Sequence, residues 1–298
     1  MRISSASTVS AVVEHCLSKA VDLALGDPLL DTSFALDPFE RIKRAADDGF
    51  RSILINDHRE PVSPVAAFLR DNEAFRPAID VVAGVVLNQE VGGLNVFAAE
   101  HCLLLAGRLV SMPTVSSQNY CRKFRRDLAR ASNARSALPG EQLTILDDRF
   151  LLRPDAQEIL DLIAAHDAIL DAGYVHLSEI WELLKEAKRR GVGRILVRDP
   201  DRYAGASPDE IQALADAGIF IGFTISQDDA DLERFIQYND VPREKLILHV
   251  MPDRRRERIL SFADKFVSAG ASTDDLRVVL AETGMRLLEG KSASSTLS

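Results

Sequence analysis

The chain has 298 residues, of which 46% are hydrophobic, 27% charged and 6% aromatic, and its formal net charge is −9. This composition excludes a chain that is disordered throughout, and the length allows one large α/β domain or two small ones. The acidic balance argues against a protein that coats nucleic acid, and three cysteines without a C-x-x-C pair favour a reduced, cytoplasmic protein.

The two ends of the chain predict no targeting or membrane segment. Residues 1–18 lack the apolar core of a signal peptide and are expected to form a tail or a short helix. No apolar run approaches the roughly 20 residues of a membrane helix. Residues 290–298 are rich in Gly, Ser and Lys and predict a disordered tail, which leaves residues 19–289 as a single domain.

Short apolar runs bounded by turn residues predict eight buried strands. In chain order they cover residues 20–25, 51–55, 81–87, 108–112, 168–171, 194–197, 219–224 and 245–250. None shows clean polar alternation, which is typical of parallel strands covered on both faces.

Amphipathic helical patterns separate these runs. They cover residues 39–48, 96–106, 156–165, 177–190, 208–217, 231–238 and 256–268, and a last helix over 273–288 is expected on the outside. Eight β-then-α units over roughly 250 residues predict a (β/α)8 TIM barrel. A doubly wound sheet is the alternative, but Gly26 stands alone after the first strand, so the glycine fingerprint of dinucleotide binding is missing.

The repeating pattern is interrupted after the fourth βα unit by residues 131–152. Within this insertion, residues 143–152 read as a small hairpin that turns at Asp147 and Asp148. Insertions of this kind often lie over the active-site mouth of a barrel. This segment is therefore expected to act either as a lid or as a contact between subunits of an oligomer.

Catalytic groups of a TIM barrel lie at the carboxyl ends of its strands, and three of the six histidines, His58, His176 and His249, fall at such ends. With Asp57 and Asp199, His58 and His249 form a candidate acid/base or metal-ligand set. The two aspartates can equally cap the next helix or pair with neighbouring arginines.

Polar residues at other strand ends predict contacts to a small polar or anionic substrate. An asparagine amide can donate and accept hydrogen bonds at the same time, which suits a polar substrate. Asn88 and Asn95, on either side of Gly92 and Gly93, can also form hydrogen bonds within their own loop. The basic run over residues 254–258 can bind an anion or form a solvated helical turn. The candidate substrate-binding residues are Asn88, Asn95, Thr114, Arg198 and Arg254.

Several stretches resemble an uncharacterised family of amidohydrolase-like barrels within the metal-dependent hydrolase superfamily. They are residues 21–28, 84–95, 111–115, 144–148, 158–167 and 187–197, and the most specific part is the stretch 88–95. The resemblance extends over about residues 21–288 and implies a TIM barrel of the amidohydrolase type.

The metal-binding motifs of that family are degenerate in this sequence. Members of the family carry Asp-Leu-His-x-His at the end of the first strand, where this chain reads Asp22-Leu23-Ala24-Leu25-Gly26. After strand two, the family has paired histidines where this chain has Asp57-His58. After strand five, it has Gly-His where this chain has Gly173-Tyr174, and after strand six it has Thr-His-Pro where this chain has Arg198-Asp199-Pro200. We therefore expect no ordinary catalytic metal centre and no cofactor.

Three functions remain open at this point. The first is a metal-independent acid/base enzyme of the lyase, cyclase or proton-transfer type, with a small-molecule substrate. Its candidate catalytic residues are His58, Asp57, Asp199, His249 and Tyr174. The second is a non-catalytic pseudoenzyme or partner subunit, and a homo-oligomer is also left open. The third is a hydrolase with a divalent metal at Asp57, His58 and Asp199, with Asp253 nearby, where oxygen-rich ligation favours Mg or Mn.

Overall fold

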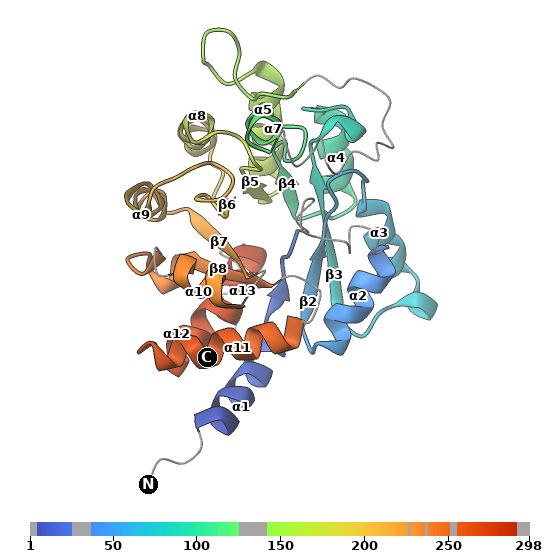
Figure 1. The fold of residues 1–298 in the computed structure, drawn as a ribbon. Helices are drawn as coiled ribbons and strands as arrows, with labels where there is room; N and C mark the ends of the chain where they lie inside the picture. The colour runs from blue at the N-terminus through green and yellow to red at the C-terminus, as the bar shows by residue number, and fades with distance from the viewer. Residues whose placement is uncertain are drawn as a thin grey trace.

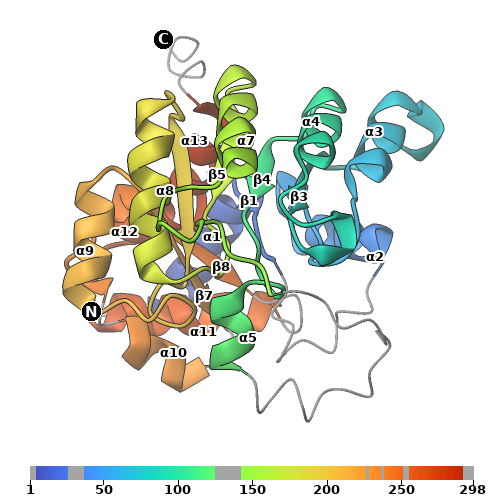
Figure 2. The ribbon, with the colours of Figure 1, turned by 90° about the horizontal axis from the view of Figure 1, so that it is seen from above.

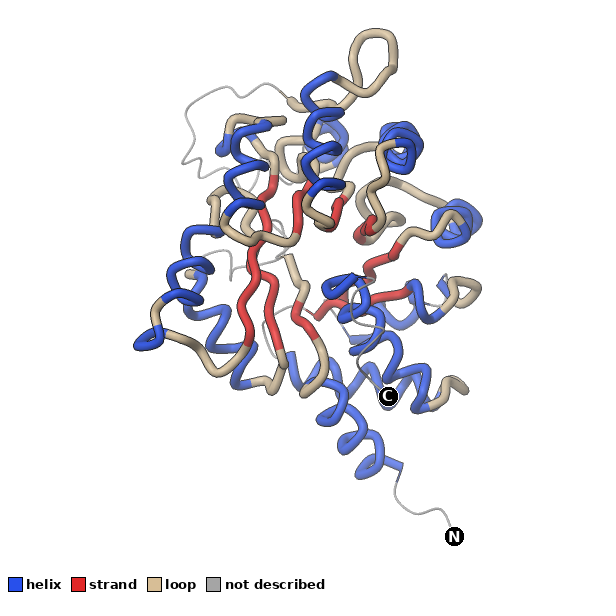
Figure 3. Tube along the Cα trace, turned by 180° about the vertical axis from the view of Figure 1, so that it is seen from behind, coloured by secondary structure: helices blue, strands red, loops and turns tan. Residues whose placement is uncertain are grey.

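A computed structural model describes residues 5–25, 37–124, 142–225, 228–235, 238–250 and 255–290 of the chain. Its centre is one eight-stranded sheet in the order β1 to β8, in which every neighbouring pair is parallel. The strands gather in the middle of the molecule and the helices surround them (Figures 1–3). This arrangement confirms the predicted (β/α)8 TIM barrel.

The strands follow the predicted runs closely. They are β1 (Val21–Asp22), β2 (Ser52–Ile55), β3 (Asp80–Val86), β4 (Leu109–Ser111), β5 (Ile169–Asp171), β6 (Arg194–Arg198), β7 (Phe220–Ile225) and β8 (Leu246–Val250). Almost every strand residue is buried, as expected for strands that face both a barrel interior and a layer of helices.

The helices of the described residues also match the predicted segments, with two additions. They are α1 (Ser5–Leu17), α2 (Pro38–Asp47), α3 (Ser63–Asp71), α4 (Val96–Leu104), α5 (Gln118–Lys123), α7 (Pro154–Ala165), α8 (Leu177–Arg189), α9 (Pro208–Asp216), α10 (Asp228–Phe235) and α11 (Arg255–Ser268), followed by α12 (Thr273–Arg277), the π-helical turn η6 (Val278–Glu282) and α13 (Thr283–Glu289). Short 3-10 turns are η2 (Glu73–Phe75), η3 (Gln89–Val91) and η5 (Arg243–Lys245). The sequence did not predict α3 and α5. Within the described residues, no helix is long and apolar enough to cross a bilayer.

The barrel interior is a compact apolar cluster to which α13 contributes. Its fully or nearly fully buried members include Leu23, Leu54, Leu109, Ile169, Leu196, Ile247, Leu287 and Leu288. At the start of β6, Arg194 Nη1 donates hydrogen bonds to the carbonyls of Leu287 at 2.9 Å and Leu288 at 2.7 Å, satisfying carbonyls at the end of the helix. The last turn of α13 therefore covers the amino-terminal opening of the barrel.

α13 also lies where the sheet does not close. No pairing between β8 and β1 is found among the described residues, whereas α13 contacts both strands. A Cβ at Gly284 would lie 3.2 Å from Val21 Cγ1 and 3.8 Å from Ile247 Cγ2, so the helix backbone approaches both strands closely. The prediction of one outer helix over residues 273–288 is wrong for its last part, because the leucines of α13 pack inward.

The predicted hairpin is present in the described part of the insertion. Asp147 N donates to Leu151 O at 2.8 Å, and Leu146 and Leu152 form an antiparallel bridge. Asp147 Oδ1 accepts from the backbone N–H groups of Arg149 and Leu151, so this carboxylate fixes the turn. Residues 131–141 of the predicted insertion and residues 291–298 of the predicted tail lie outside the described residues.

Candidate active site

Above the apolar cluster, the barrel interior becomes polar. Side chains alternate along a strand, so the residue two positions after an interior leucine or isoleucine faces the interior again, one layer nearer the carboxyl ends. Among the polar residues at those positions are Asn56, Asp171, Arg198 and His249, all buried. We call these four residues the inner polar layer. They lie at the end of the barrel where TIM-barrel enzymes carry their chemistry.

Arg198 extends across this layer from β6. Its Nε donates to Asp171 Oδ2 on β5 at 2.6 Å, and its Nη1 donates to the carbonyl of Leu23 beyond β1 at 2.6 Å. Asp171 Oδ1 accepts from the backbone N–H of Gly173 at 3.0 Å, which fixes the carboxylate. The third guanidinium nitrogen, Nη2, is buried and has no hydrogen-bond partner within the described residues.

His249 and Asn56 carry further buried polar atoms without partners. Neither ring nitrogen of His249, nor the amide nitrogen or oxygen of Asn56, has a hydrogen-bond partner among the described residues. Such groups are costly and rare in folded proteins, and they are typical of a place that takes up water or a ligand. Burial, with the nearby Arg198 guanidinium as a second cause, holds the pKa of His249 well below its ordinary value, so the imidazole is neutral.

Gly222 on β7 makes room for this histidine. A Cβ at Gly222 would lie 2.6 Å from His249 Nε2 and 3.4 Å from Arg198 Cα, which is too close for any side chain without a shift of the ring. Because Gly222 of β7 has no side chain, His249 of β8 can lie toward Arg198 of β6.

A second polar group contains His58 and joins the loops after β2, β3 and β4. His58 Nδ1 lies 2.6 Å from Thr114 Oγ1, and Asn88 Nδ2 donates to the same hydroxyl at 2.7 Å and to the carbonyl of His58 at 2.8 Å. Asn88 Oδ1 accepts from the backbone N–H groups of Thr114 and Ser116. The Asn88 amide is thus fully used in fixing His58 and Thr114, and its role is positional.

Tyr174 connects His58 to an aromatic cluster. The rings of His58 and Tyr174 are 5.7 Å apart, and Tyr174 stacks on Tyr203 with ring centroids at 3.8 Å. Tyr120 of α5 also stacks on Tyr174, with ring centroids at 5.5 Å. Tyr120 and Tyr203 were not predicted as site residues from the sequence, because nothing in their local patterns distinguishes them from ordinary core aromatics.

Asp199 belongs to a separate buried network. Its Oδ1 accepts from Thr224 N at 2.8 Å and from Arg234, and its Oδ2 accepts from Thr224 Oγ1 at 2.5 Å. Arg234 Nε also pairs with Asp201 at 2.7 Å. Burial raises the pKa of the Asp199 carboxyl, and the Arg234 guanidinium opposes this shift. The alternative foreseen for Asp199, pairing with an arginine, is what its contacts show, although the arginine is Arg234 and not Arg198.

Two further candidates bond within their own loops. Asp57 Oδ1 accepts from the backbone N–H groups of Arg59 at 2.8 Å and Glu60 at 3.2 Å, which makes it a turn-forming carboxylate. Asn95 caps α4 by accepting from Phe97 N and Ala98 N, and its Nδ2 donates to the carbonyl of Val91. Arg254 and Asp253 lie outside the described residues.

The residues present do not fit the divalent metal centre that the fold family implies. Ala24 offers no donor atom, and Asp199 is engaged by Arg234. The centre of the inner polar layer already holds the positive guanidinium of Arg198. Within the described ranges, no group of three or more His, Cys, Asp or Glu side chains could hold a metal ion.

Solved structures with the same architecture support the class of the fold. An amidohydrolase from Pseudomonas aeruginosa is 14% identical, with a TM-score of 0.60 over 94% of this chain and 98% of that one. The probable dipeptidase PvdM from the same organism is 10% identical, with a TM-score of 0.59 over 95% and 98% of the two chains. YJJV, a TatD homolog from Escherichia coli, is 15% identical, with a TM-score of 0.54 over 92% and 99%.

The fold is thus a TIM barrel similar to the barrels of these three structures. A family model, the Family of unknown function (DUF6282), matches residues 32–222, and the chain belongs to this family. No curated protein matches the sequence significantly.

Proposed function

We propose that the protein is a metal-independent acid/base enzyme of the lyase, cyclase or proton-transfer type that acts in the cytoplasm on a small polar or anionic metabolite. One observation carries the proposal. Three buried residues of the inner polar layer, Asn56, Arg198 and His249, have polar atoms without partners at the end of the barrel where substrates bind.

Arg198 is proposed to bind the anionic group of the substrate. Guanidinium groups pair strongly with carboxylate and phosphate oxygens, and two contacts of Arg198 to Asp171 and Leu23 hold the side chain in place before the substrate arrives. The amide of Asn56 would donate to and accept from the substrate's remaining polar atoms.

His249 is proposed to act as a neutral hydrogen-bonding group toward a substrate carbonyl. Because its pKa is held low by burial and by Arg198, its imidazole is a poor proton acceptor at neutral pH. A neutral imidazole can still donate one hydrogen bond to an oxygen that gains negative charge during the reaction.

His58 is proposed to be the general acid/base that transfers a proton to or from the substrate. Thr114 lies 2.6 Å from His58 Nδ1 and Asn88 donates to Thr114 Oγ1, so the hydroxyl has one proton left to offer, and the Asn88–Thr114 pair fixes the ring. Tyr174 packs beside the ring at 5.7 Å and restricts its orientation.

The proposal is tested with metal-depleted protein and a panel of small oxo- and hydroxy-acids in D2O, followed by proton NMR. We expect hydrogen–deuterium exchange or product formation with at least one acid, and a loss of at least about 100-fold in His58→Ala, as for a general acid/base. His101→Ala is the matched control, since His101 is exposed on α4. Binding of an acid without any exchange or turnover would contradict the proposal and favour a binding barrel.

A further inference from the structure

The inner polar layer contains one guanidinium and one carboxylate, and their two charges balance each other. Arg198 Nε and Asp171 Oδ2 are 2.6 Å apart, and the two side chains are 4% and 0% exposed. Such a pair interacts strongly, because little water is present to weaken the attraction. Since the imidazole of His249 and the amide of Asn56 are neutral, the four residues together have no net charge.

The charged side chains around this layer leave little positive charge for a ligand. Asp22, at the end of β1, lies 2.8 Å from Arg255 Nη1. Beside β6 and β7, one guanidinium faces three carboxylates, and these residues are Arg234, Asp199, Asp201 and Asp231. Arg41 of α2 donates to the backbone carbonyls of Ala24 at 3.1 Å and Asn56 at 2.6 Å, and it adds at most one positive charge. These surroundings balance one negative charge on a ligand, but not two.

Arg198 has one guanidinium nitrogen left for a ligand. Its Nε donates to Asp171 and its Nη1 to the carbonyl of Leu23, so only Nη2 has no partner within the described residues. Arginine binds phosphate best when two of its nitrogens contact two phosphate oxygens side by side. The other buried donors of the layer, the amide of Asn56 and one ring nitrogen of His249, are neutral. One charged and two neutral contacts match a carboxylate with a neighbouring carbonyl or hydroxyl oxygen.

Burial adds to the preference for a single charge. Asn56 is fully buried, and Arg198 and His249 are each 3% exposed, so a ligand group that contacts them loses its water. The free energy of taking an ion out of water rises with the square of its charge, and the contacts formed in return must offset it. A carboxylate has one charge to desolvate, whereas a phosphate group at neutral pH has about two. A guanidinium that is already paired can offset the first cost but not the second.

We propose that the substrate of the inner polar layer is a small monocarboxylate, and that Asp171 selects it against doubly charged phosphates by balancing the charge of Arg198. This inference rests on the proposed function, which places the substrate at this layer. Asp171 acts through Arg198 and does not itself touch the substrate. It is therefore a positioning residue that also determines specificity.

The charge preference is measured on the wild-type full chain by isothermal titration calorimetry with two matched pairs of probes. Pyruvate and lactate carry one charge, whereas acetylphosphonate and 1-hydroxyethylphosphonate keep their carbon skeletons and carry two charges at about pH 8.5. We expect pyruvate or lactate to bind at least about tenfold more tightly than its phosphonate. The monomethyl ester of acetylphosphonate keeps the phosphonate shape with one charge, and it should bind more tightly than acetylphosphonate.

Asp171→Asn frees the charge of Arg198 with almost no change in side-chain volume. We expect the ratio of phosphonate to carboxylate affinity to rise at least about tenfold in this variant, a change that a merely structural role of Asp171 would not produce. The control Glu90→Gln removes a carboxylate from an exposed position on η3, at the same end of the barrel, and should keep the wild-type ratio.

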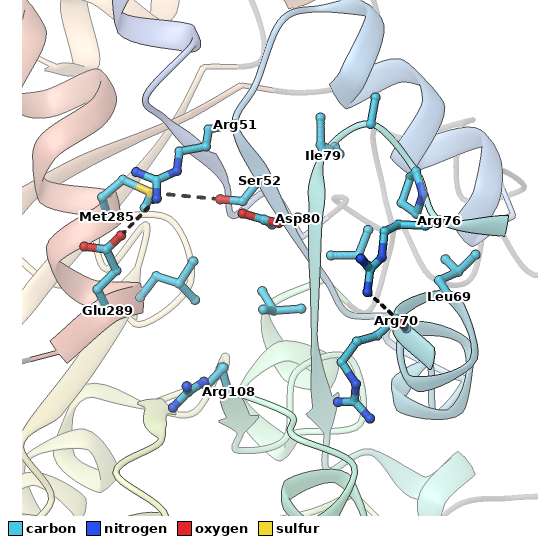
Figure 4. A pocket seen from close by; sticks show the side chains of 15 residues that line it. Arg51, Ser52, Leu69, Arg70, Arg76, Ile79, Asp80, Arg108, Met285 and Glu289 are labelled. Carbon is cyan, nitrogen blue, oxygen red and sulfur yellow. Dashed lines mark hydrogen bonds and ion pairs between the residues drawn. The ribbon is translucent and has the colours of Figure 1, made fainter. Parts of the chain in front are cut away.

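Arg198→Gln should lose at least about tenfold in affinity for pyruvate and lactate. Its control is Arg108→Gln, because Arg108 is exposed at the opposite end of the barrel, where it borders a hollow of about 530 Å³ at the amino-terminal ends of β2 to β4 (Figure 4). Arg76 and Arg108 of that hollow point apart (Figure 4), so Arg108→Gln should bind both acids like the wild type.

Three results would overturn the inference: no binding of either carboxylate, phosphonates that bind the wild type as tightly as the carboxylates, or a wild-type ratio in Asp171→Asn. None of these measurements needs turnover, so they leave the proposed acid/base chemistry to its own test. Binding of pyruvate or lactate that depends on Arg198 but brings no proton exchange would support the substrate class and contradict the proposed function alone.

Discussion

At the scale of single residues, the candidate site depends on a missing side chain as much as on those present. Gly222→Ala would place a Cβ 2.6 Å from His249 Nε2, so the imidazole must move away from Arg198. We expect turnover to fall by at least about tenfold while the fold is retained, because a displaced contact group costs catalysis more than stability. Gly193→Ala is the control, since a Cβ there meets no atom within 4 Å. Equal turnover in the two variants would show that His249 does not need its present position.

The buried imidazole of His249 also predicts how stability depends on pH. In the unfolded chain a histidine has its ordinary pKa of about 6.5, whereas the folded state holds the pKa of His249 well below this value. Below about pH 6.5 the unfolded state therefore binds more protons, and stability falls by up to about 1.4 kcal/mol per pH unit as the pH decreases.

His249→Gln should remove this part of the slope. The measurement is urea unfolding of the wild type and His249→Gln between pH 5 and 8, with His101→Gln as the exposed control. A wild-type slope that persists in His249→Gln would contradict a neutral buried imidazole.

At the scale of elements, α13 has a role that its sequence pattern does not reveal. Leu287 is fully buried in the barrel interior, and its carbonyl accepts from Arg194. Leu287→Ala should therefore lower the free energy of unfolding by about 2–5 kcal/mol, the usual cost of a cavity in a core. Leu104→Ala on α4, where the side chain is 68% exposed, should change it by less than about 0.5 kcal/mol. Chemical denaturation of both variants measures the difference, and similar costs would mean that α13 is not part of the core.

The elements that could be predicted are those whose burial follows from a local pattern of apolar residues in the sequence. All eight strands follow from apolar runs, because parallel strands of a barrel are covered on both faces. The position of α13 could not be predicted, since an amphipathic pattern shows that one face is buried but not against what. For the same reason Asp199 was foreseen at a strand end, while its partner Arg234, 35 residues later, was not.

At the scale of the whole molecule, the two ends of the barrel differ in what they offer a ligand. The carboxyl ends present one fixed guanidinium, a neutral imidazole and an amide inside the barrel. The amino-terminal end is covered by α13 and bordered by four exposed arginines, Arg51, Arg70, Arg76 and Arg108. Both ends thus present positively charged side chains although the chain as a whole is acidic, because the net charge does not determine where charges lie on the molecule.

The same distribution of charge predicts that the protein works without a metal ion. Arg198, held by Asp171 at 2.6 Å, is a permanent cation in the middle of the inner polar layer, and a divalent cation beside it would be repelled. Protein purified without chelator should contain less than about a tenth of an equivalent of Zn, Mn, Fe or Mg, and EDTA should leave turnover and melting temperature unchanged, whereas metal-dependent folds lose stability on chelation. Elemental analysis and thermal unfolding before and after EDTA give the measurement. A near-stoichiometric metal whose removal abolishes activity would contradict the prediction, and it would require ligands that include residues such as Asp253 beyond the described ranges.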